Sequence, residues 1–213
     1  MWLDNDDVYS FASAADFATN TGGTFLGNAS ASGGTGNDAS LSISDDGTVY
    51  AFYNGGDVWT AATIGDFITN TNVTFVGNRG GLNGGDTDLA IGPGGSVTAL
   101  LWNGDVWQWS SMANFISDSG AAFMGTRPFG QNGGNTSIAI DDSGAVTAFF
   151  GDGSVWSFAD AASFGNDTNN SFLGNRSGNG SINRIAASTV PEPATLLPLL
   201  GALGMLALRR RRA

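Results

Sequence analysis

The chain repeats one pattern of about 49 residues four times, and this periodicity constrains its fold more than any other feature. Each copy has a Val that is followed nine and seventeen residues later by Phe, with a Gly two residues after the second Phe. The copies start 50, 48 and 49 residues apart, at Val8, Val58, Val106 and Val155. Self-similarity at a fixed period indicates a repeat architecture in which each unit buries its apolar face against its neighbours.

Each copy predicts four short strands and one short helix. An alternating stretch such as 41–43 comes first, and a turn at 45–47 leads into a second strand at 48–53. The pair Gly55-Gly56 suits a tight hairpin turn before the third strand. The helix N-cap falls at one repeat position, occupied by Ser13, Thr63, Ser111 and Asp160. Core packing is predicted for the aromatic residue after each Val, namely Tyr9, Trp59, Trp107 and Trp156.

A unit of this size and content resembles one blade of a β-propeller. We therefore expect an all-β repeat propeller of about four blades over residues 1–188, with a β-solenoid as the alternative. The repeat segments are 1–28, 39–78, 87–126 and 136–175. The first copy lacks the first strand and half of the second. Residues 182–187 match a first strand, so we expect this segment to close the ring.

Composition excludes several kinds of chemistry. The chain has no Cys and no His, so it can form neither a disulfide nor a Ser-His-Asp triad. Its only Glu is Glu192, which leaves Asp as the carboxylate of the repeats. A net charge of −11 repels phosphate backbones, so nucleic acid is not expected as a partner. We expect a protein that is not an enzyme, with a carboxylate-dependent carbohydrate-active enzyme as the alternative.

Residues 189–213 form a separate C-terminal segment. The motif Val-Pro-Glu-Pro-Ala at 190–194 precedes an apolar stretch at 194–208, and four arginines end this stretch, at Arg209, Arg210, Arg211 and Arg212. The pattern predicts a C-terminal transmembrane helix. The arginines resist translocation, so they are expected to stay on the cytoplasmic side and leave the repeats outside.

This segment resembles the PEP-CTERM sorting signal of Gram-negative bacteria, which is also labelled the C-terminal domain of ice-binding proteins. The resemblance implies that an exosortase recognises Pro191, Glu192 and Pro193. It also implies an exported protein, anchored by its C-terminal helix before processing and then located at the cell surface or outside the cell. Proteins with this signal often accompany extracellular polysaccharide. The first residues lack a basic and apolar export signal, so we expect a signal peptide to be encoded upstream of Met1.

Two sets of residues are candidate ligand contacts. Trp102 stands just before a hairpin turn, where an aromatic side chain either stacks on a sugar ring or caps a sheet edge. Arg79, Arg127 and Arg176 share one repeat position, two residues after the Gly near the end of each copy. These arginines either ring one face and bind carboxylates or sulfated sugars, or pair with neighbouring Asp residues.

No metal or cofactor is assigned from the sequence. Asp-rich stretches at 4–7, 44–47, 83–88 and 141–144 lack a complete calcium-binding loop, and turn chemistry accounts for them. Calcium stays an alternative. We expect a non-catalytic protein of adhesion or extracellular-matrix binding, with polysaccharide as its partner, and a structural envelope component without a ligand as the remaining alternative.

Overall fold

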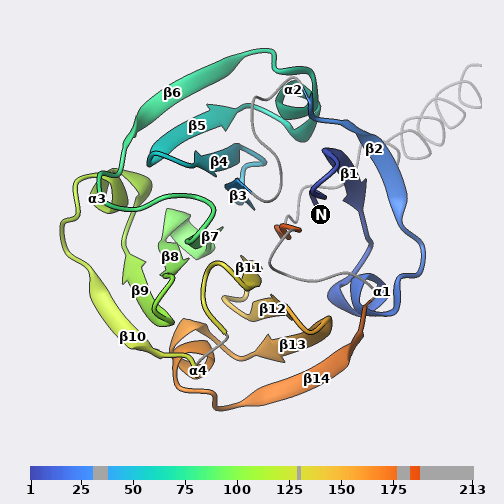
Figure 1. Cartoon of the computed structure of the whole chain (residues 1–213), viewed down its shortest axis with the longest axis vertical. Helices are drawn as coiled ribbons and strands as arrows, with labels where there is room; N and C mark the ends of the chain where they lie inside the picture. Colours follow the sequence, from blue (N-terminus) through green and yellow to red (C-terminus); the bar gives the residue numbers. More distant parts are fainter. Residues whose placement is uncertain (31–37, 129–130, 177–182, 188–213) are drawn as a thin grey trace, which may run out of the picture.

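The computed structural model describes residues 1–30, 38–128, 131–176 and 183–187. Within these ranges the chain is an all-β protein of antiparallel sheets with short helices between strands (Figure 1). The repeated-sheet architecture that the sequence predicts is therefore confirmed. The predicted sorting motif at 190–194, the apolar stretch at 194–208 and the arginines at 209–212 lie outside the described residues.

In the described part of the chain, no helix combines the length and the apolar character that crossing a bilayer requires.

Three of the four repeats form four-stranded antiparallel sheets in which consecutive strands are neighbours. The second sheet consists of β3 (Ala39–Ile43), β4 (Val49–Tyr53), β5 (Asp57–Ala61) and β6 (Val73–Asn78). The third sheet consists of β7 (Asp88–Ile91), β8 (Val97–Leu100), β9 (Asp105–Trp109) and β10 (Ala122–Thr126). The fourth sheet consists of β11 (Thr136–Ile140), β12 (Val146–Phe150), β13 (Ser154–Phe158) and β14 (Asn170–Asn175).

The first sheet is assembled from both ends of the described chain. Its regular strands are β1 (Asp7–Ser10) and β2 (Thr24–Asn28), which pair antiparallel. Trp2 forms a bridge with Val8 on one side and with Arg184 on the other. Two backbone hydrogen bonds of 2.8 Å join Trp2 and Arg184, one in each direction. The residues around Arg184 therefore occupy, in the first sheet, the place that β3, β7 and β11 occupy in the others.

A short helix connects the third and fourth strands of every sheet. These helices are α1 (Ala14–Thr19), α2 (Ile64–Thr69), α3 (Met112–Ile116) and α4 (Ala161–Gly165). The predicted N-caps are confirmed, because the side chains at that position each accept a backbone N–H from three residues onward, at Ser13, Thr63, Ser111 and Asp160. A 3-10 turn, η2 (Pro93–Gly95), joins β7 and β8.

The four sheets are arranged around a common centre (Figure 1). Strands β3, β7 and β11 lie nearest the centre, and β2, β6, β10 and β14 form the perimeter. The apolar core lies at the boundaries between neighbouring sheets, which we call junctions. At the junction of the second and third sheets, the rings of Phe52 and Phe115 meet edge-on at 5.5 Å. At the junction of the fourth and first sheets, Phe149 and Phe17 meet in the same way at 5.2 Å.

Candidate functional site

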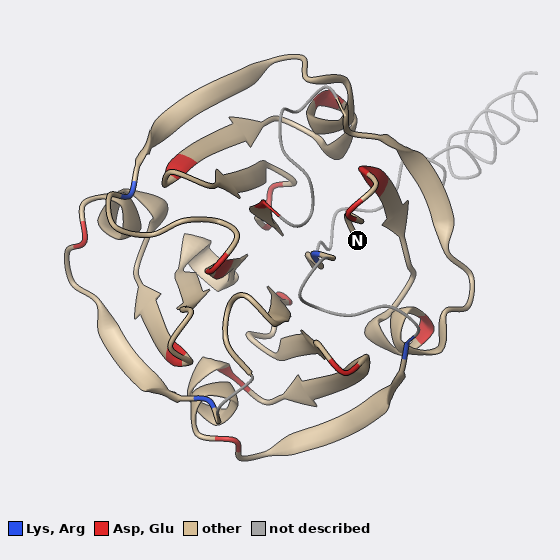
Figure 2. Ribbon diagram, in the orientation of Figure 1, with Lys and Arg blue, Asp and Glu red and all other residues tan. Residues whose placement is uncertain are grey.

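At three junctions, an arginine from the loop after the outer strand of one sheet reaches across to the next sheet. We call this contact the clasp. The guanidinium of each arginine packs over the Phe of the next sheet's helix. The distances from guanidinium carbon to ring centroid are 5.9 Å for Arg79 on Phe115, 4.9 Å for Arg127 on Phe164 and 4.6 Å for Arg176 on Phe17. Figure 2 places the basic segments of the perimeter between neighbouring sheets, well separated from one another.

The polar contacts of these arginines also lie within the junctions. Arg127 is buried, donates to the backbone oxygen of Phe164 at 2.6 Å and pairs with Asp167 at 2.9 Å. Arg79 pairs with Asp118 at 2.6 Å. Arg176 donates to the backbone oxygen of Phe17 at 2.7 Å. The guanidinium of each of these three arginines thus has a partner in the neighbouring sheet. Of the two sequence interpretations, pairing with Asp describes Arg79 and Arg127.

The junction between the first and second sheets departs from this pattern at three repeat positions. Ala29 stands where the other sheets have their arginine. Asn70 stands at the position of Asp118 and Asp167, as Asn20 does in the first sheet, and together with Ala29 it leaves this junction with neither partner of the ion pair. Ala61 stands where the other repeats have a large aromatic residue, namely Phe11, Trp109 and Phe158.

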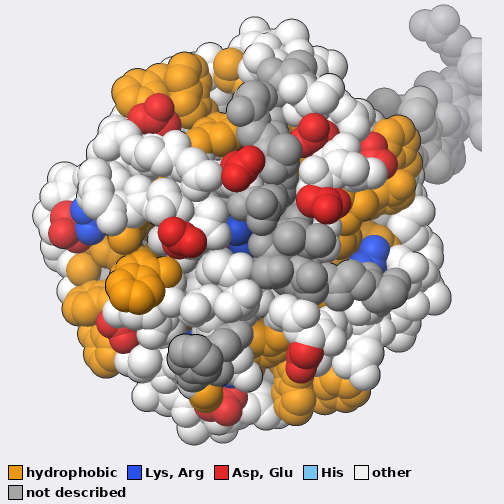
Figure 3. Space-filling view, viewed as in Figure 1, with side chains coloured by type: hydrophobic (Ala, Val, Ile, Leu, Met, Phe, Trp, Pro, Cys, Tyr) orange, Lys and Arg blue, Asp and Glu red, His pale blue; other side chains and the backbone are white. Residues whose placement is uncertain are grey.

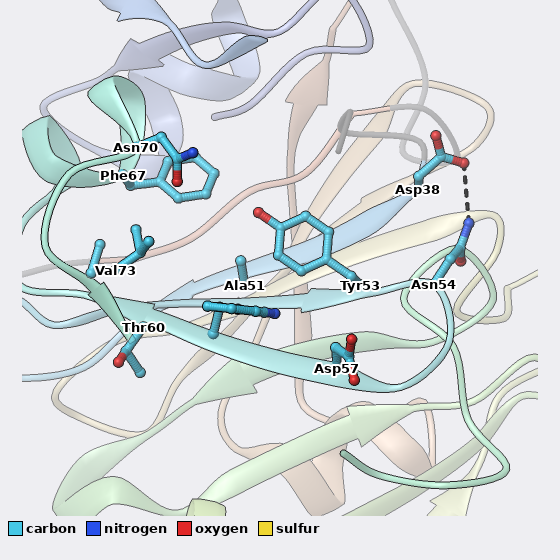
Figure 4. Close-up of a pocket in the computed structure, with 11 residues that line it drawn as sticks. Asp38, Ala51, Tyr53, Asn54, Asp57, Thr60, Phe67, Asn70 and Val73 are labelled. Atoms are coloured by element: carbon cyan, nitrogen blue, oxygen red, sulfur yellow. Dashed lines mark hydrogen bonds between the residues drawn. The ribbon is translucent and has the colours of Figure 1, made fainter. Parts of the chain in front are cut away.

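A cavity of about 660 Å³ opens beside these substitutions, on the face of the second sheet that is turned to the first (Figure 4). This volume falls within the range of about 300–1,000 Å³ that is typical of small-molecule sites. Its floor comes from β4 and β5, and the end of α2 forms one wall. The lining residues are Asp38, Ala51, Tyr53, Asn54, Asp57, Trp59, Thr60, Ala61, Phe67, Asn70 and Val73.

The lining combines aromatic surfaces with oxygen and amide groups. Trp59 is 36% exposed, and Figure 4 shows Tyr53 standing between α2 and the turn that carries Asn54. The amide of Asn54 donates to the carboxylate of Asp38 at 3.2 Å, and this contact is drawn as a dashed line. Asp57 accepts from the amide of Asn78 at 2.7 Å. The described lining residues include two carboxylates and no basic side chain.

The aromatic residues at the Tyr9 position only partly follow the predicted core packing, because Trp107 and Trp156 are partly buried and pack against the core, whereas Trp59 is exposed. Each member of the set contacts a half-exposed Phe on the outer strand of its own sheet. The ring centroids are 5.1–5.4 Å apart in the pairs Tyr9–Phe25, Trp59–Phe75, Trp107–Phe123 and Trp156–Phe172. Figure 3 shows the hydrophobic patches around the perimeter. Repetition therefore marked a shared environment, and this environment is the margin of the core, where the third strand meets the outer strand.

Trp102 lies in the turn between β8 and β9 and is 64% exposed. It is absent from the described residues that line the cavity, and the three clasping arginines are absent from them as well. The structure therefore does not bring the four ligand-contact residues predicted from the sequence into one site.

A second polar cluster, which the sequence interpretation missed, lies at the centre of the molecule. Pairing with the second strand of each sheet gives Ser40, Asp88, Ser137 and Arg184 one equivalent position. These side chains link each inner strand to the next one. Ser40 accepts from the N–H of Leu89 at 2.7 Å, Asp88 accepts from the N–H of Ile138, and Ser137 accepts from the N–H of Ile185 at 2.9 Å. Arg184 completes the circle by donating to the oxygen of Ala39 at 2.9 Å.

Arg184 and Asp88 form a buried ion pair in this cluster. Both side chains are fully buried, and Nη1 of Arg184 lies 3.8 Å from Oδ1 of Asp88. Burial raises the pKa of the Asp88 carboxyl, and the neighbouring Arg184 opposes this shift. The signal that could have found the pair was the alignment of 182–187 with a first strand, which places opposite charges at equivalent positions.

Asp-rich turns are occupied by their own hydrogen bonds. Oδ1 of Asp141 accepts from the N–H groups of Ser143 and Ala145 at 2.9 and 3.0 Å. Asp46 accepts from the N–H of Thr48 at 3.0 Å and from the hydroxyl of Ser44 at 2.7 Å. Among the residues for which the structure gives positions, no three acidic side chains are grouped so as to hold a metal ion.

Comparison with known proteins gives little guidance. No family model matches the chain, and no curated protein matches it. The computationally designed Ika4 protein aligns over 71% of this chain and 80% of its own, with 16% identity and a TM-score of 0.35. The computationally designed Ika8 protein aligns over 69% of this chain and 39% of its own, with 17% identity and a TM-score of 0.31. Neither likeness carries an argument about this protein, so the interpretation of the cavity rests on its own residues.

Proposed function

We propose that the protein is an exported β-propeller that binds extracellular polysaccharide without cleaving it. Support for the propeller assignment comes from four repeated antiparallel sheets around a common centre, each with its first strand innermost (Figure 1). Support for ring closure by 182–187 comes from the bridge between Trp2 and Arg184. The coils of a β-solenoid would instead stack along one axis.

The cavity of the second sheet is the observation that carries the binding proposal. A sugar ring presents an apolar face, which packs on aromatic side chains, and a rim of hydroxyl groups, which hydrogen-bond to carboxylates and amides. Trp59 and Tyr53 supply aromatic surface, and Asp38, Asp57 and Asn70 supply polar groups in the same cavity. Binding rather than cleavage is proposed because hydrolysis of a glycosidic bond needs a carboxyl group that protonates the leaving oxygen, whereas both cavity carboxylates accept an amide hydrogen bond, Asp38 from Asn54 and Asp57 from Asn78.

Glycan binding by the full-length chain tests this function. We expect retention on immobilised extracellular polysaccharide and no release of reducing ends from it. Trp59→Ala should abolish retention. Trp156→Ala is the matched control, because it removes a Trp from the same repeat position at a filled junction. Release of reducing ends would favour the carbohydrate-active enzyme, and no retention of any glycan would favour a structural envelope component.

The C-terminal segment supplies the proposed cellular address. We propose that an exosortase processes the chain at Pro191, Glu192 and Pro193 after the apolar segment has entered the membrane, with Arg209–Arg212 held on the cytoplasmic side. In a host with the exosortase, the full chain should reach the surface or the medium in a shortened form. Substituting Ala at all three motif positions should leave the unshortened chain in the membrane fraction. A full-length chain in the cytosol of cells with an intact reading frame would refute this address.

A further inference from the structure

The four junctions provide an internal comparison for the cavity. At three of them, a large aromatic side chain at the end of the third strand or just after it meets the helix Phe edge-on, with ring centroids 5.1–5.5 Å apart: Trp109 and Phe115, Phe158 and Phe164, and Phe11 and Phe17. At the junction of the first and second sheets, the one ring that the described part of the chain places against Phe67 is that of Trp2, from the opposite sheet, at 5.1 Å. The missing aromatic at Ala61 therefore leaves space on the sheet face.

The absence of this arginine clasp also changes the net charge around the cavity between the first and second sheets. A repeat with the full pattern would set an arginine over Phe67 and an Asp at position 70, as Arg127 and Asp167 are set around Phe164. Here Ala29 is buried and Asn70 is neutral, so the cavity has no fixed cation. Asp38 and Asp57 are then the charged groups among the described lining residues, and they would repel an anionic ligand.

We propose that the cavity between the first and second sheets binds uncharged sugar residues and discriminates against acidic ones. This inference rests on the proposed polysaccharide binding and adds both the location and the class of sugar. The discrimination follows from the lining, because hydroxyl groups can donate to Asp38 and Asp57, whereas a uronate or sulfate would meet two carboxylates and no basic group among the described lining residues. Ala29 and Ala61 are the residues that distinguish this junction from the other three, and Asn70 replaces the Asp that two of them have.

Titration calorimetry on the full-length chain tests the proposal. The neutral probes are hexamers of β-1,4-glucose and β-1,4-mannose, and the acidic probe is the hexamer of β-1,4-mannuronate. We expect at least one neutral hexamer to bind at least tenfold more tightly than the mannuronate hexamer. Tighter binding of mannuronate would overturn the inference and leave polysaccharide binding intact. Failure of all three hexamers, together with no retention on native polysaccharide, would overturn both.

Variants that restore the repeat pattern test the location. Ala61→Phe introduces the side chain present at Phe11 and Phe158, and it should weaken binding of the neutral hexamer at least tenfold. A second variant, Ala29→Arg with Asn70→Asp, restores the arginine clasp and should also weaken binding of the neutral hexamer at least tenfold. The location can therefore be tested even if one of the two variants misfolds. Trp102→Ala is the control and should bind as the parent does, because Trp102 is exposed and is not one of the described lining residues. Binding that survives both restorations but is lost in Trp102→Ala would overturn the location.

Discussion

Replacing Arg184 with Met should destabilise the protein more than the same substitution at Arg79, Arg127 or Arg176. Arg184 is fully buried, and its Nε donates to the oxygen of Ala39 at 2.9 Å. Nη1 donates to the oxygen of Gly133 and Nη2 to that of Gly84, both at 3.3 Å. Burial lowers the pKa of the guanidinium, whereas the nearby Asp88 raises it. Met fills a similar volume but leaves the carbonyl groups without a donor and Asp88 without a counter-charge.

The expected loss in free energy of unfolding follows from the Asp88 carboxylate, which is left buried without its ion-pair partner. Removing one partner of a buried ion pair costs about 3–5 kcal/mol. A domain of this size has a free energy of unfolding of about 5–15 kcal/mol, so the loss is a large fraction of the total. With a urea dependence of about 2 kcal/mol per molar, the midpoint of unfolding should fall by about 2 M. The substitution should also weaken the backbone bridge between Trp2 and residue 184, which joins the N-terminal residues of the first sheet to the segment around Arg184.

Urea titrations of the full-length parent and four variants measure the effect: Arg184→Met, Asp88→Asn, the double variant that combines them, and Arg79→Met. Adding Asp88→Asn to Arg184→Met removes the unpaired charge and should recover about 1–3 kcal/mol in a double-mutant cycle. Arg79→Met is the control, because its partner Asp118 is more than half exposed and such pairs contribute about 0.2–1 kcal/mol. A cost below about 1 kcal/mol for Arg184→Met, or no recovery on adding Asp88→Asn, would refute this account of the centre.

Two further predictions concern backbone packing and pH. Gly84→Ala should cost about 3 kcal/mol or more in urea unfolding, because a Cβ there would lie 1.9 Å from the oxygen of Phe52, whereas Gly80→Ala, whose nearest neighbour is 4.0 Å away, should be nearly neutral. Hydrogen bonds from Thr63 to Asp66, and from Ser163 to Asp160, lower the pKa of these carboxyls below 3.8. Their stabilisation is therefore present above about pH 4 and lost as the pH falls below 3.8. Thermal midpoints measured from pH 7 to pH 2 should drop in that window, and a flat profile would contradict the assignment.

The sequence by itself determined the elements and their order. Strand alternation, Gly-containing turns and helix caps act over fewer than about ten residues, so the pattern is complete within each copy and is visible four times. The caps at Thr63 and Asp160 were predicted at the correct residues for this reason. The mismatch between the first copy and the others also pointed to 182–187 as the missing strand.

Only the tertiary structure decided what the equivalent positions do. The junctions join residues from different copies, such as Arg127 with Phe164 and Trp2 with Phe67, and no local pattern states which copies meet. Whether a repeated Trp lies in the core or at the rim depends on where the sheet ends. Asp88 is buried because its strand is the innermost one of its sheet. Side-chain volume and charge are matched between neighbouring sheets, not along the chain. The cavity beside Ala61 marks the junction where this match is incomplete. Such matching is settled only when sheets distant in sequence come into contact.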